Sequence, residues 1–421
     1  MSLTQLSQTL TPNHTATDYR GYNYDLVIVG GGIVGLTLAA ALKDSGLSVL
    51  LIEARVTSAA VAKGQAYAIH MLSARIFQGI GIWDQILPNI AKYRQVFLSD
   101  ADYPDVVKFQ NSDLEIQTPE LGYVGEHFAL LEPLQEFVQN CANVTCLCPA
   151  EVVNTQTEKD IVTVNIQVDG EHRKIRTKLL VAADGSKSPI RQAAGIKTKG
   201  WKYWQSCIVA FVRPEKSHNY TAYEKFWTSG PFAILPLPGN RCRIVWTAPH
   251  EEAKALCALS DEEFLAELTK RYGNQMGKLE LLGDRFIFQV QLMQSDRYVL
   301  PRLALVGDAA HNCHPVGGQG LNLGIRDAAA LAEVIQTAHQ AGEDIGKIEV
   351  LKKYEIWRKK ENLAILGFTD LLDRVFSNNL LPVVIIRRLG LWFMQRVPMI
   401  KIFALKLMIG LKGKTPELGR M

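Results

Sequence analysis

The chain has 421 residues, of which 48% are hydrophobic and 21% are charged, and its net charge at pH 7 is +4. This composition is typical of a globular protein with a large core, and the length favours two or three domains. The seven cysteines are odd in number and scattered, which argues against a disulfide framework and indicates a reducing compartment.

The first 24 residues are polar and rich in Thr, Asn and Gln. They lack an apolar core flanked by basic residues, so they do not resemble a signal peptide. We expect residues 1–24 to form a mobile N-terminal tail.

A strand, a glycine-rich turn and a helix follow this tail. The apolar run Leu26–Val29 predicts the strand, and the helix after it is expected to run to about Ser45. A second apolar run, Val49–Ile52, predicts the next strand of a parallel sheet.

The turn between the first strand and the helix reads Gly30-x-Gly32-x-x-Gly35. Gly30 makes the tight turn, Gly32 lets a pyrophosphate approach the backbone, and Gly35 allows close packing of helix on strand. Glu53 stands 21 residues beyond Gly32, at the end of the second strand, where a carboxylate binds ribose hydroxyls. The pattern predicts dinucleotide binding without separating NAD from FAD.

The middle of the chain predicts a small sheet and a second turn. Strands are expected over Glu151–Gln167 and His172–Arg176, with Asp169-Gly170 as a hairpin turn. In the segment Leu179–Arg191, an apolar strand is expected to end at Ala183, and a second Asp-Gly turn, Asp184-Gly185, follows it.

Alternating apolar residues in Trp201–Pro249 predict antiparallel strands of a sheet with one covered face. The segment Asp261–Tyr272 predicts an amphipathic surface helix, and Phe286–Tyr298 leads back towards the next strand.

The segment Leu303–Leu331 organises the rest of the chain. A strand over Leu303–Val306 breaks at Gly307-Asp308, and a glycine-rich loop then leads to a helix predicted from Leu321. A strand that feeds a glycine loop and a helix N-terminus is suited to bind an anionic group. Gly307 permits close approach to the backbone, and Asp308 can accept hydrogen bonds from ligand hydroxyls.

The C-terminal region, 366–421, combines apolar helices with basic residues. From Leu380 onward the net charge is +7, whereas the rest of the chain carries −3. The longest uncharged run, Val375–Ile386, has 12 residues and is too short to span a bilayer. We expect contact with a membrane surface through Arg387, Arg388, Arg396, Lys401 and Lys406; the alternative is a set of core helices or an oligomer interface. The pattern does not predict nucleic-acid binding.

The three glycine motifs, in this order, resemble those of the FAD-dependent aromatic hydroxylases, which are single-component flavoprotein monooxygenases. Over Asp25–Gly413 the chain most resembles the ubiquinone-biosynthesis hydroxylase family. The resemblance implies an α/β fold of the p-hydroxybenzoate-hydroxylase type. Such a fold has a Rossmann-like FAD-binding domain, an inserted β-sheet substrate domain and a helical C-terminus.

The resemblance also implies a division of the chain into interleaved parts. The FAD-binding domain is expected in three parts, 25–100, 126–200 with the Asp-Gly motif, and 299–365. The substrate domain is expected to take the strands of 101–125 and the segment 201–298, before the C-terminal helices of 366–421.

Twelve residues are expected to bind non-covalent FAD. They are Gly30, Gly32, Gly35, Glu53, Asp184, Gly307, Asp308, Pro315, Gly318, Gly320, Leu321 and Asn322. The substrate pocket is expected to involve Tyr223, Phe226, Phe232, Leu235 and Pro236. Relatives often carry Arg at the positions of Gln65 and His127, so those two flavin contacts are not transferred. No metal site and no catalytic acid or base is predicted, because the flavin carries the chemistry.

By resemblance, NADPH or NADH reduces the flavin, and O2 then supplies one OH to a lipid-soluble phenol, a polyprenylated intermediate of ubiquinone or a related quinone. One alternative is the same fold acting on a small soluble aromatic or reducing a prenyl chain. Another is a catalytically silent flavin-binding component that joins other proteins in a quinone-synthesis assembly. The expected location is cytoplasmic, with peripheral attachment to a membrane surface.

Overall fold

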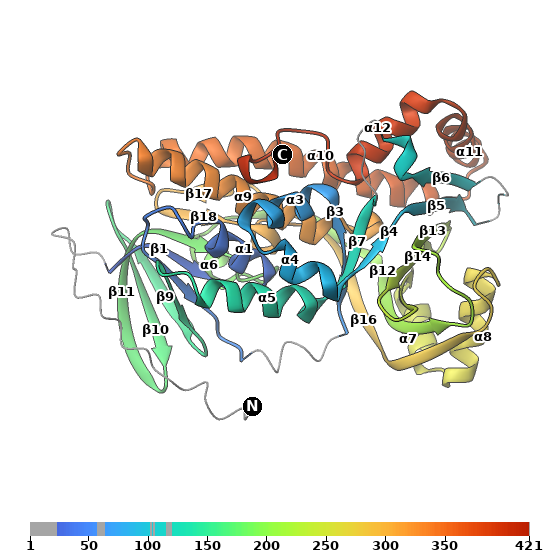
Figure 1. The fold of residues 1–421 in the computed structure, drawn as a ribbon, viewed down its shortest axis with the longest axis horizontal. Helices are drawn as coiled ribbons and strands as arrows, with labels where there is room; N and C mark the ends of the chain where they lie inside the picture. Colours follow the sequence, from blue (N-terminus) through green and yellow to red (C-terminus); the bar gives the residue numbers. More distant parts are fainter. Residues whose placement is uncertain (1–22, 57–63, 102, 104–105, 115–119, 421) are drawn as a thin grey trace.

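The computed structural model describes residues 23–56, 64–101, 103, 106–114 and 120–420. Most of the expected tail, residues 1–22, therefore lies outside the described part of the chain. The described residues form two large sheets, with the long helices α9 (Gln319–Gln340) and α10 (Ile348–Phe376) running beside both (Figure 1).

The first sheet contains the dinucleotide-binding pattern, and its central strands are parallel. In spatial order its strands are β17 (Val299–Leu300), β18 (Leu303–Leu305), β11 (Glu171–Ala182), β1 (Tyr24–Val29), β2 (Val49–Ile52) and β8 (Val144–Leu147). The strands β9 (Glu151–Thr157) and β10 (Val162–Val168) pair antiparallel beyond β11. Asp169 and Gly170 both have positive φ between β10 and β11, so the predicted hairpin turn is confirmed.

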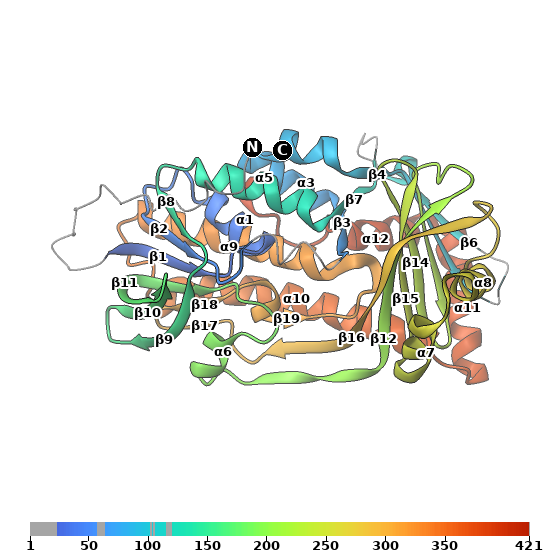
Figure 2. The same cartoon turned by 90° about the horizontal axis from the view of Figure 1, so that it is seen from below.

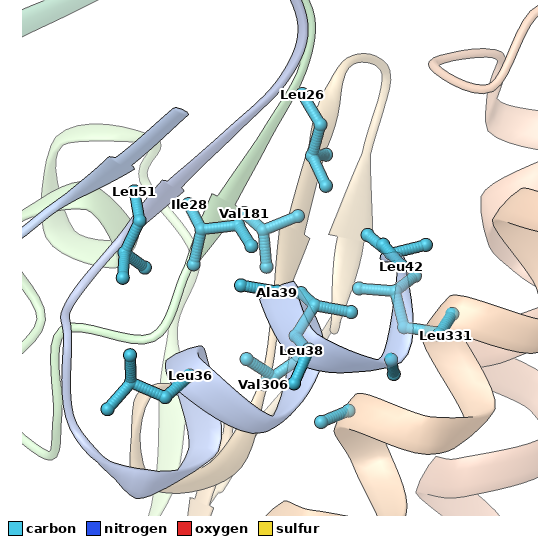
Figure 3. Packing of buried hydrophobic residues seen from close by; sticks show 14 of the residues in the cluster. Leu26, Ile28, Leu36, Leu38, Ala39, Leu42, Leu51, Val181, Val306 and Leu331 are labelled. Carbon is cyan, nitrogen blue, oxygen red and sulfur yellow. The ribbon is translucent and has the colours of Figure 1, made fainter. Parts of the chain in front are cut away.

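The core of this half lies between the first sheet and its helices. Helix α1 (Ile33–Ala41) packs between the sheet and α9, and Leu331 of α9 lies beside Leu42, which follows α1 (Figure 3). The other helices of this half are α3 (Met71–Ile80), α4 (Trp83–Ile86), η3 (Leu87–Asn89), α5 (His127–Gln139) and α6 (Pro189–Ala193). Helix α1 ends at Ala41, earlier than predicted, and α9 begins two residues before Leu321.

The second sheet is mainly antiparallel and forms the other half of the molecule (Figure 2). In spatial order its strands are β19 (His311–Asn312), β16 (Leu279–Ser295), β12 (Thr198–Pro214), β15 (Arg241–Pro249), β14 (Gly230–Leu237), β13 (Thr221–Trp227), β5 (Gln95–Asp100) and β6 (Val106–Gln110). A small sheet of β3 (Ala66–His70), β7 (Gly122–Glu126) and β4 (Ala91–Tyr93) lies between the two large ones.

Helices α7 (His250–Ala258) and α8 (Asp261–Tyr272) cover one face of the second sheet. The bounds of α8 match the prediction, because Ser260 and Glu263 form a reciprocal cap at its start. The short elements η4 (Asn111–Asp113), η5 (Gly307–Ala309), η6 (Val316–Gly318) and η7 (Glu417–Gly419) complete the described fold.

The C-terminal helices α11 (Leu381–Arg396) and α12 (Pro398–Met408) lie against β5 and β6 at one end of the molecule (Figure 1). Among the described residues, no helix is both long and apolar enough to cross a membrane.

Three of the basic residues expected at a membrane surface instead pair with acids of the body. Arg387 is buried and pairs with Asp100, and Arg388 forms a second ion pair with the same carboxylate. Lys401 pairs with Asp113 at 2.8 Å. The prediction was wrong for Arg387, because a buried and paired guanidinium cannot contact lipid. Acids of the body also balance part of the positive charge of the C-terminal helices.

Candidate functional site

The first glycine motif lies where β1 meets α1. A Cβ atom at Gly30 would overlap the Ala183 carbonyl, and one at Gly35 would overlap the Gly30 carbonyl. A Cβ atom at Gly32, in contrast, would meet no atom within 4 Å. Gly30 therefore makes a tight turn and Gly35 allows close packing, as predicted, whereas Gly32 leaves open space beside the N-terminus of α1, where an anionic group can bind.

Glu53 closes the same turn from the end of β2. Its carboxylate accepts hydrogen bonds from the backbone N–H groups of Gly31 and Arg55, each at 2.7 Å. A carboxylate has about four acceptor positions, so these two bonds leave room for ribose hydroxyls.

A cavity of about 850 Å³ lies between the two large sheets. Its walls combine the glycine turns of the first sheet, the glycine loop before α9, one face of the second sheet and the end of α12. The predicted site residues that line it are Gly32, Asp308, Pro315, Gly318, Gly320, Leu321, Tyr223 and Leu235.

Asp308 faces this cavity from the turn after β18. Gly307, before it, has φ 58°, which favours glycine. The Asp308 carboxylate is open to the cavity, but the cavity itself is surrounded by protein. This enclosure removes the carboxylate from bulk water and raises its pKa. Behind the turn, the buried Asp327 carboxylate accepts hydrogen bonds from Gly307 N–H and Arg358 Nε and contacts His311 Nε2 at 2.6 Å.

The loop before α9 and the first turn of α9 line the cavity. Gly317 and Gly318 both adopt left-handed conformations, and no side chain caps the helix that follows. The first N–H groups of an uncapped helix are free donors, and its dipole favours negative charge there. Asn322 does not line the cavity, because its side chain bonds Ala68 O, Ser73 Oγ and His70 N–H.

The second Asp-Gly turn borders the cavity from the other side. Gly185 lines the cavity, whereas Asp184 lies beside it with one buried oxygen, Oδ1, that has no hydrogen-bond partner among the described residues. Arg191 donates to Ser186 O and to Ala309 O, both at 2.8 Å. It thereby joins this turn to the one that carries Asp308.

In the second sheet, the position of a residue along its strand decides whether its side chain faces the cavity or the helices α7 and α8. On β14, Pro231, Ala233 and Leu235 line the cavity, whereas Phe232 packs among the residues that face α7 and α8. Successive residues of a strand point to opposite faces, so Phe232 and Leu235 do not share one.

Three of the five expected pocket residues therefore lie away from the cavity. Phe232 is fully buried in the α7–α8 core, and Pro236 does not contribute to the lining. Phe226 stacks on Phe376 with ring centroids 4.0 Å apart. Tyr223 lines the cavity, although its ring packs edge-on against Phe97. Register explains Phe232 and Pro236, which point to the face opposite Leu235. Phe226 is paired with Pro231 on the cavity-facing side of the sheet, but Phe376 of α10 covers it there.

Several polar residues of the cavity were not predicted. Tyr67 donates to Gln65 Oε1 at 2.6 Å and contacts His127 Nδ1 at 3.2 Å, so the two positions that depart from the family belong to one network. Arg243 and Glu224 enter the cavity from β15 and β13. Each of these two residues is a charged residue at a strand position where the alternation predicts an apolar one. The sequence therefore contained this signal, but the prediction did not use it.

Comparison with known proteins gives a consistent result. The family model described as "FAD binding domain" matches residues 23–366. Ubiquinone hydroxylase UbiL of Rhodospirillum rubrum is 38% identical over 400 residues, which cover 94% of this chain and 92% of the relative. The 3-demethoxyubiquinol 3-hydroxylase of Escherichia coli is 34% identical over 392 residues, which cover 92% of this chain and 98% of the relative.

Among solved structures, the p-nitrophenol 4-monooxygenase PnpA of Pseudomonas putida superimposes with a TM-score of 0.77. The match covers 92% of this chain and 99% of that one at 19% identity. At this identity the likeness shows the fold, and the predicted p-hydroxybenzoate-hydroxylase-like architecture is confirmed.

Proposed function

We propose that this chain, which belongs to the FAD-dependent hydroxylases of ubiquinone biosynthesis, uses NADH or NADPH and O2 to hydroxylate the ring of a polyprenylated phenol. The family makes it an FAD-dependent monooxygenase. The electron donor and the phenol are our proposal, and the names of the two relatives, which both refer to ubiquinone-type rings, support it.

One observation carries the proposal. A single cavity joins the motifs expected to bind FAD to a wall of the second sheet where a substrate ring can lie. The residues present fit FAD: Gly32 leaves open space at a helix N-terminus, the first turn of α9 has no side-chain cap on its N–H groups, and Asp308 offers a carboxylate. Bound FAD would supply the redox chemistry, and the protein positions it and limits access of water.

We further propose that the twelve residues expected from the sequence form the FAD site, with two kinds of role. Gly32, Glu53 and Asp308 would contact the cofactor through open backbone or carboxylate oxygens. Gly35 and Asn322 would act by shaping the turns, since one is packed and the other fully hydrogen bonded. The interleaved domain limits given above are likewise proposed.

Part of the cavity wall suits a hydrocarbon chain. Leu405, Met408 and Ile409, at the end of α12, line the cavity. On the same helix, Met399 is 81% exposed and Phe403 is 55% exposed. Helix α12 is therefore apolar towards both the cavity and the surface, which supports a substrate that resides in a lipid phase.

We propose that this surface contacts a membrane. The C-terminal apolar face comprises the exposed residues Leu380, Leu381, Ile385, Ile386, Leu389, Trp392, Phe393, Met399, Ile400 and Phe403. Exposed apolar side chains interspersed with basic residues are typical of helices that lie in a membrane interface. Because Arg387 and Lys401 are engaged with Asp100 and Asp113, apolar burial is expected to contribute more than charge.

The hydroxylation is tested with purified holoprotein, NADH or NADPH and a lipid-soluble phenol. The phenol is expected to accelerate flavin reduction, and product formed under 18O2 is expected to carry one labelled oxygen. Label that enters from H2 18O instead contradicts the mechanism. Rapid oxidation of the nicotinamide without a hydroxylated product points to the alternative use of the fold.

The membrane contact is tested by sedimentation with vesicles. Ile386, Met399 and Phe403 are changed together to Asn, and we expect loss of binding to anionic vesicles with FAD still bound. A matched control changes the exposed Ile356 of α10, outside this face, to Asn and is expected to bind normally. If the unaltered protein fails to bind anionic vesicles at low salt, the face is better explained as a protein interface.

A further inference from the structure

Glu224 is a carboxylate within an otherwise apolar row that crosses the second sheet. Its cross-strand neighbours are Leu98 on β5 and Ala233 on β14, and the row continues to Val245 on β15. Directly opposed residues of paired strands point to the same face. Ala233 and Val245 line the cavity, and Glu224 lines it with them.

The surroundings of this carboxylate are apolar on several sides. The neighbouring lining includes Val96, Ala222 and Val316, together with Leu405 and Met408 of α12. Only 8% of the Glu224 surface is exposed. Burial of a charged group in apolar surroundings is unfavourable unless a partner compensates for it. A carboxylate at this position therefore indicates a partner.

Gly317 supplies part of that partner. Its N–H donates to Glu224 Oε1 at 3.3 Å, and among the described residues this is the hydrogen bond that the carboxylate receives. A carboxylate has about four acceptor positions, so most remain available. Gly317 lies between Pro315 and Gly318, two residues expected to bind FAD, so Glu224 lies where the proposed cofactor wall and the proposed substrate wall converge.

The ionisation of Glu224 is compatible with a hydrogen-bond acceptor near neutral pH. Burial raises its pKa to about 7, and the Gly317 N–H opposes this increase. Burial also lowers the pKa of His70 to about 3 and raises that of Tyr93, so both neighbours are neutral at pH 7. The other titratable or charged groups that line the cavity are Tyr67, His127, Lys187, Cys207, Arg243, Asp308 and Cys313, whereas the ring of Tyr223 lies on the opposite face of the sheet against Tyr272.

We propose, on the basis of the function proposed above, that Glu224 accepts the hydrogen bond of the substrate's phenolic O–H and selects a phenol without a ring carboxylate. A ring carboxylate would add a second negative charge to the pocket that holds Glu224, and two like charges in one buried site are unfavourable. The hydrocarbon chain of the phenol would lie against Leu405 and Met408. If the proton moves, the O–H bond breaks, its electron pair stays on the ring oxygen and the proton rests on Glu224.

The test measures ligand binding to the FAD-loaded protein through changes in flavin absorbance. The probes are 2-dodecylphenol, its methyl ether 2-dodecylanisole, and 3-dodecyl-4-hydroxybenzoate. The unaltered protein at pH 8 is expected to bind the phenol roughly tenfold to a hundredfold more tightly than the ether, as for a hydrogen bond to a charged group. It is expected to bind the benzoate no better than the ether.

Two substitutions separate recognition of the phenol from support of the loop. Glu224→Leu is expected to abolish the preference for phenol over ether. Glu224→Gln keeps an oxygen for the Gly317 N–H but cannot ionise. In the unaltered protein the preference should increase as pH rises through about 7, and in Glu224→Gln it should not change with pH. The control Glu126→Gln alters a carboxylate outside the cavity lining that pairs with Arg241, and it should behave as the unaltered protein.

The outcomes distinguish this inference from the proposed function. If Glu224→Leu keeps the preference, or if Glu224→Gln keeps the pH dependence, Glu224 only supports the Gly317 loop and the inference is overturned. If the unaltered protein binds the phenol and the ether equally, the inference is again overturned, and 18O incorporation from O2 decides separately whether the hydroxylase function holds.

Discussion

The buried carboxylate of Asp327 is expected to stabilise both the fold and the turn that carries Asp308. Asp327 and Arg358 are fully buried and pair at 2.8 Å. Gly307 N–H, Arg358 Nε and Asn362 Nδ2 all donate to the Asp327 carboxylate. In Asp327→Asn, the new amide NH2 group must face at least one of these donors. Removal of one partner of a buried ion pair costs about 3–5 kcal/mol, so we expect a loss of stability of that size.

Urea denaturation, followed by tryptophan fluorescence, measures this change in the free energy of unfolding. Glu361→Gln is the matched control, because Glu361 pairs with the same Arg358 but is partly exposed. Glu361 is 23% exposed, so water screens its pairing with Arg358 more than that of Asp327, and Glu361→Gln is expected to lose less stability than Asp327→Asn. Asp327→Asn should also weaken FAD binding, since Gly307 N–H loses its acceptor. Equal stability losses in the two variants would refute the reasoning, because they would show that burial of the pair does not matter.

Three further predictions follow from the same geometry. FAD should co-purify and be released on denaturation; flavin that stays with the precipitate would exclude non-covalent binding. Asp308→Ala and Glu53→Ala should each weaken FAD binding roughly tenfold to a hundredfold in titrations of the apoprotein, and unchanged affinity in both would show that the cofactor lies elsewhere. Burial alone would raise the pKa of Asp327, but His311 and Arg358 outweigh it and lower that pKa to about 2. The difference in the free energy of unfolding between the unaltered protein and Asp327→Asn should therefore be largest above about pH 4. It should decrease as the pH falls towards 2.

The sequence was sufficient for the turns and strands whose chemistry is local. Gly30, Gly35 and Asp169-Gly170 occupy positions that close packing or positive φ restricts to few residue types. The strand at Val49–Ile52 has the predicted bounds, because a fully buried parallel strand is a continuous apolar run. Family motifs added the order of the parts and the cofactor, which no local pattern specifies.

The substrate wall was less predictable, because it depends on pairing between distant strands. Phe226 and Phe232 were selected because they are aromatic residues in the expected segment. In the structure the two side chains are buried in different hydrophobic clusters on opposite faces of the second sheet. Glu224 was overlooked for the same reason, since only its alignment with Ala233 and Leu98 shows which face it occupies. Arg387 similarly looked like a surface charge until Asp100, 287 residues earlier, became its partner.

Helix α12 relates the two expectations that the sequence left separate, a lipid-soluble substrate and a membrane contact. Its final turns line the cavity through Leu405 and Met408, while its first turns expose Met399 and Phe403. Gln319, in the first turn of α9, donates to Met408 O, so the end of α12 is attached to the loop expected to hold the flavin. A movement of α12 that admits a hydrocarbon chain would therefore also act on that loop. The proposed membrane contact and the proposed entry of the hydrocarbon chain therefore share one helix, α12, which is hydrogen bonded to the first turn of α9.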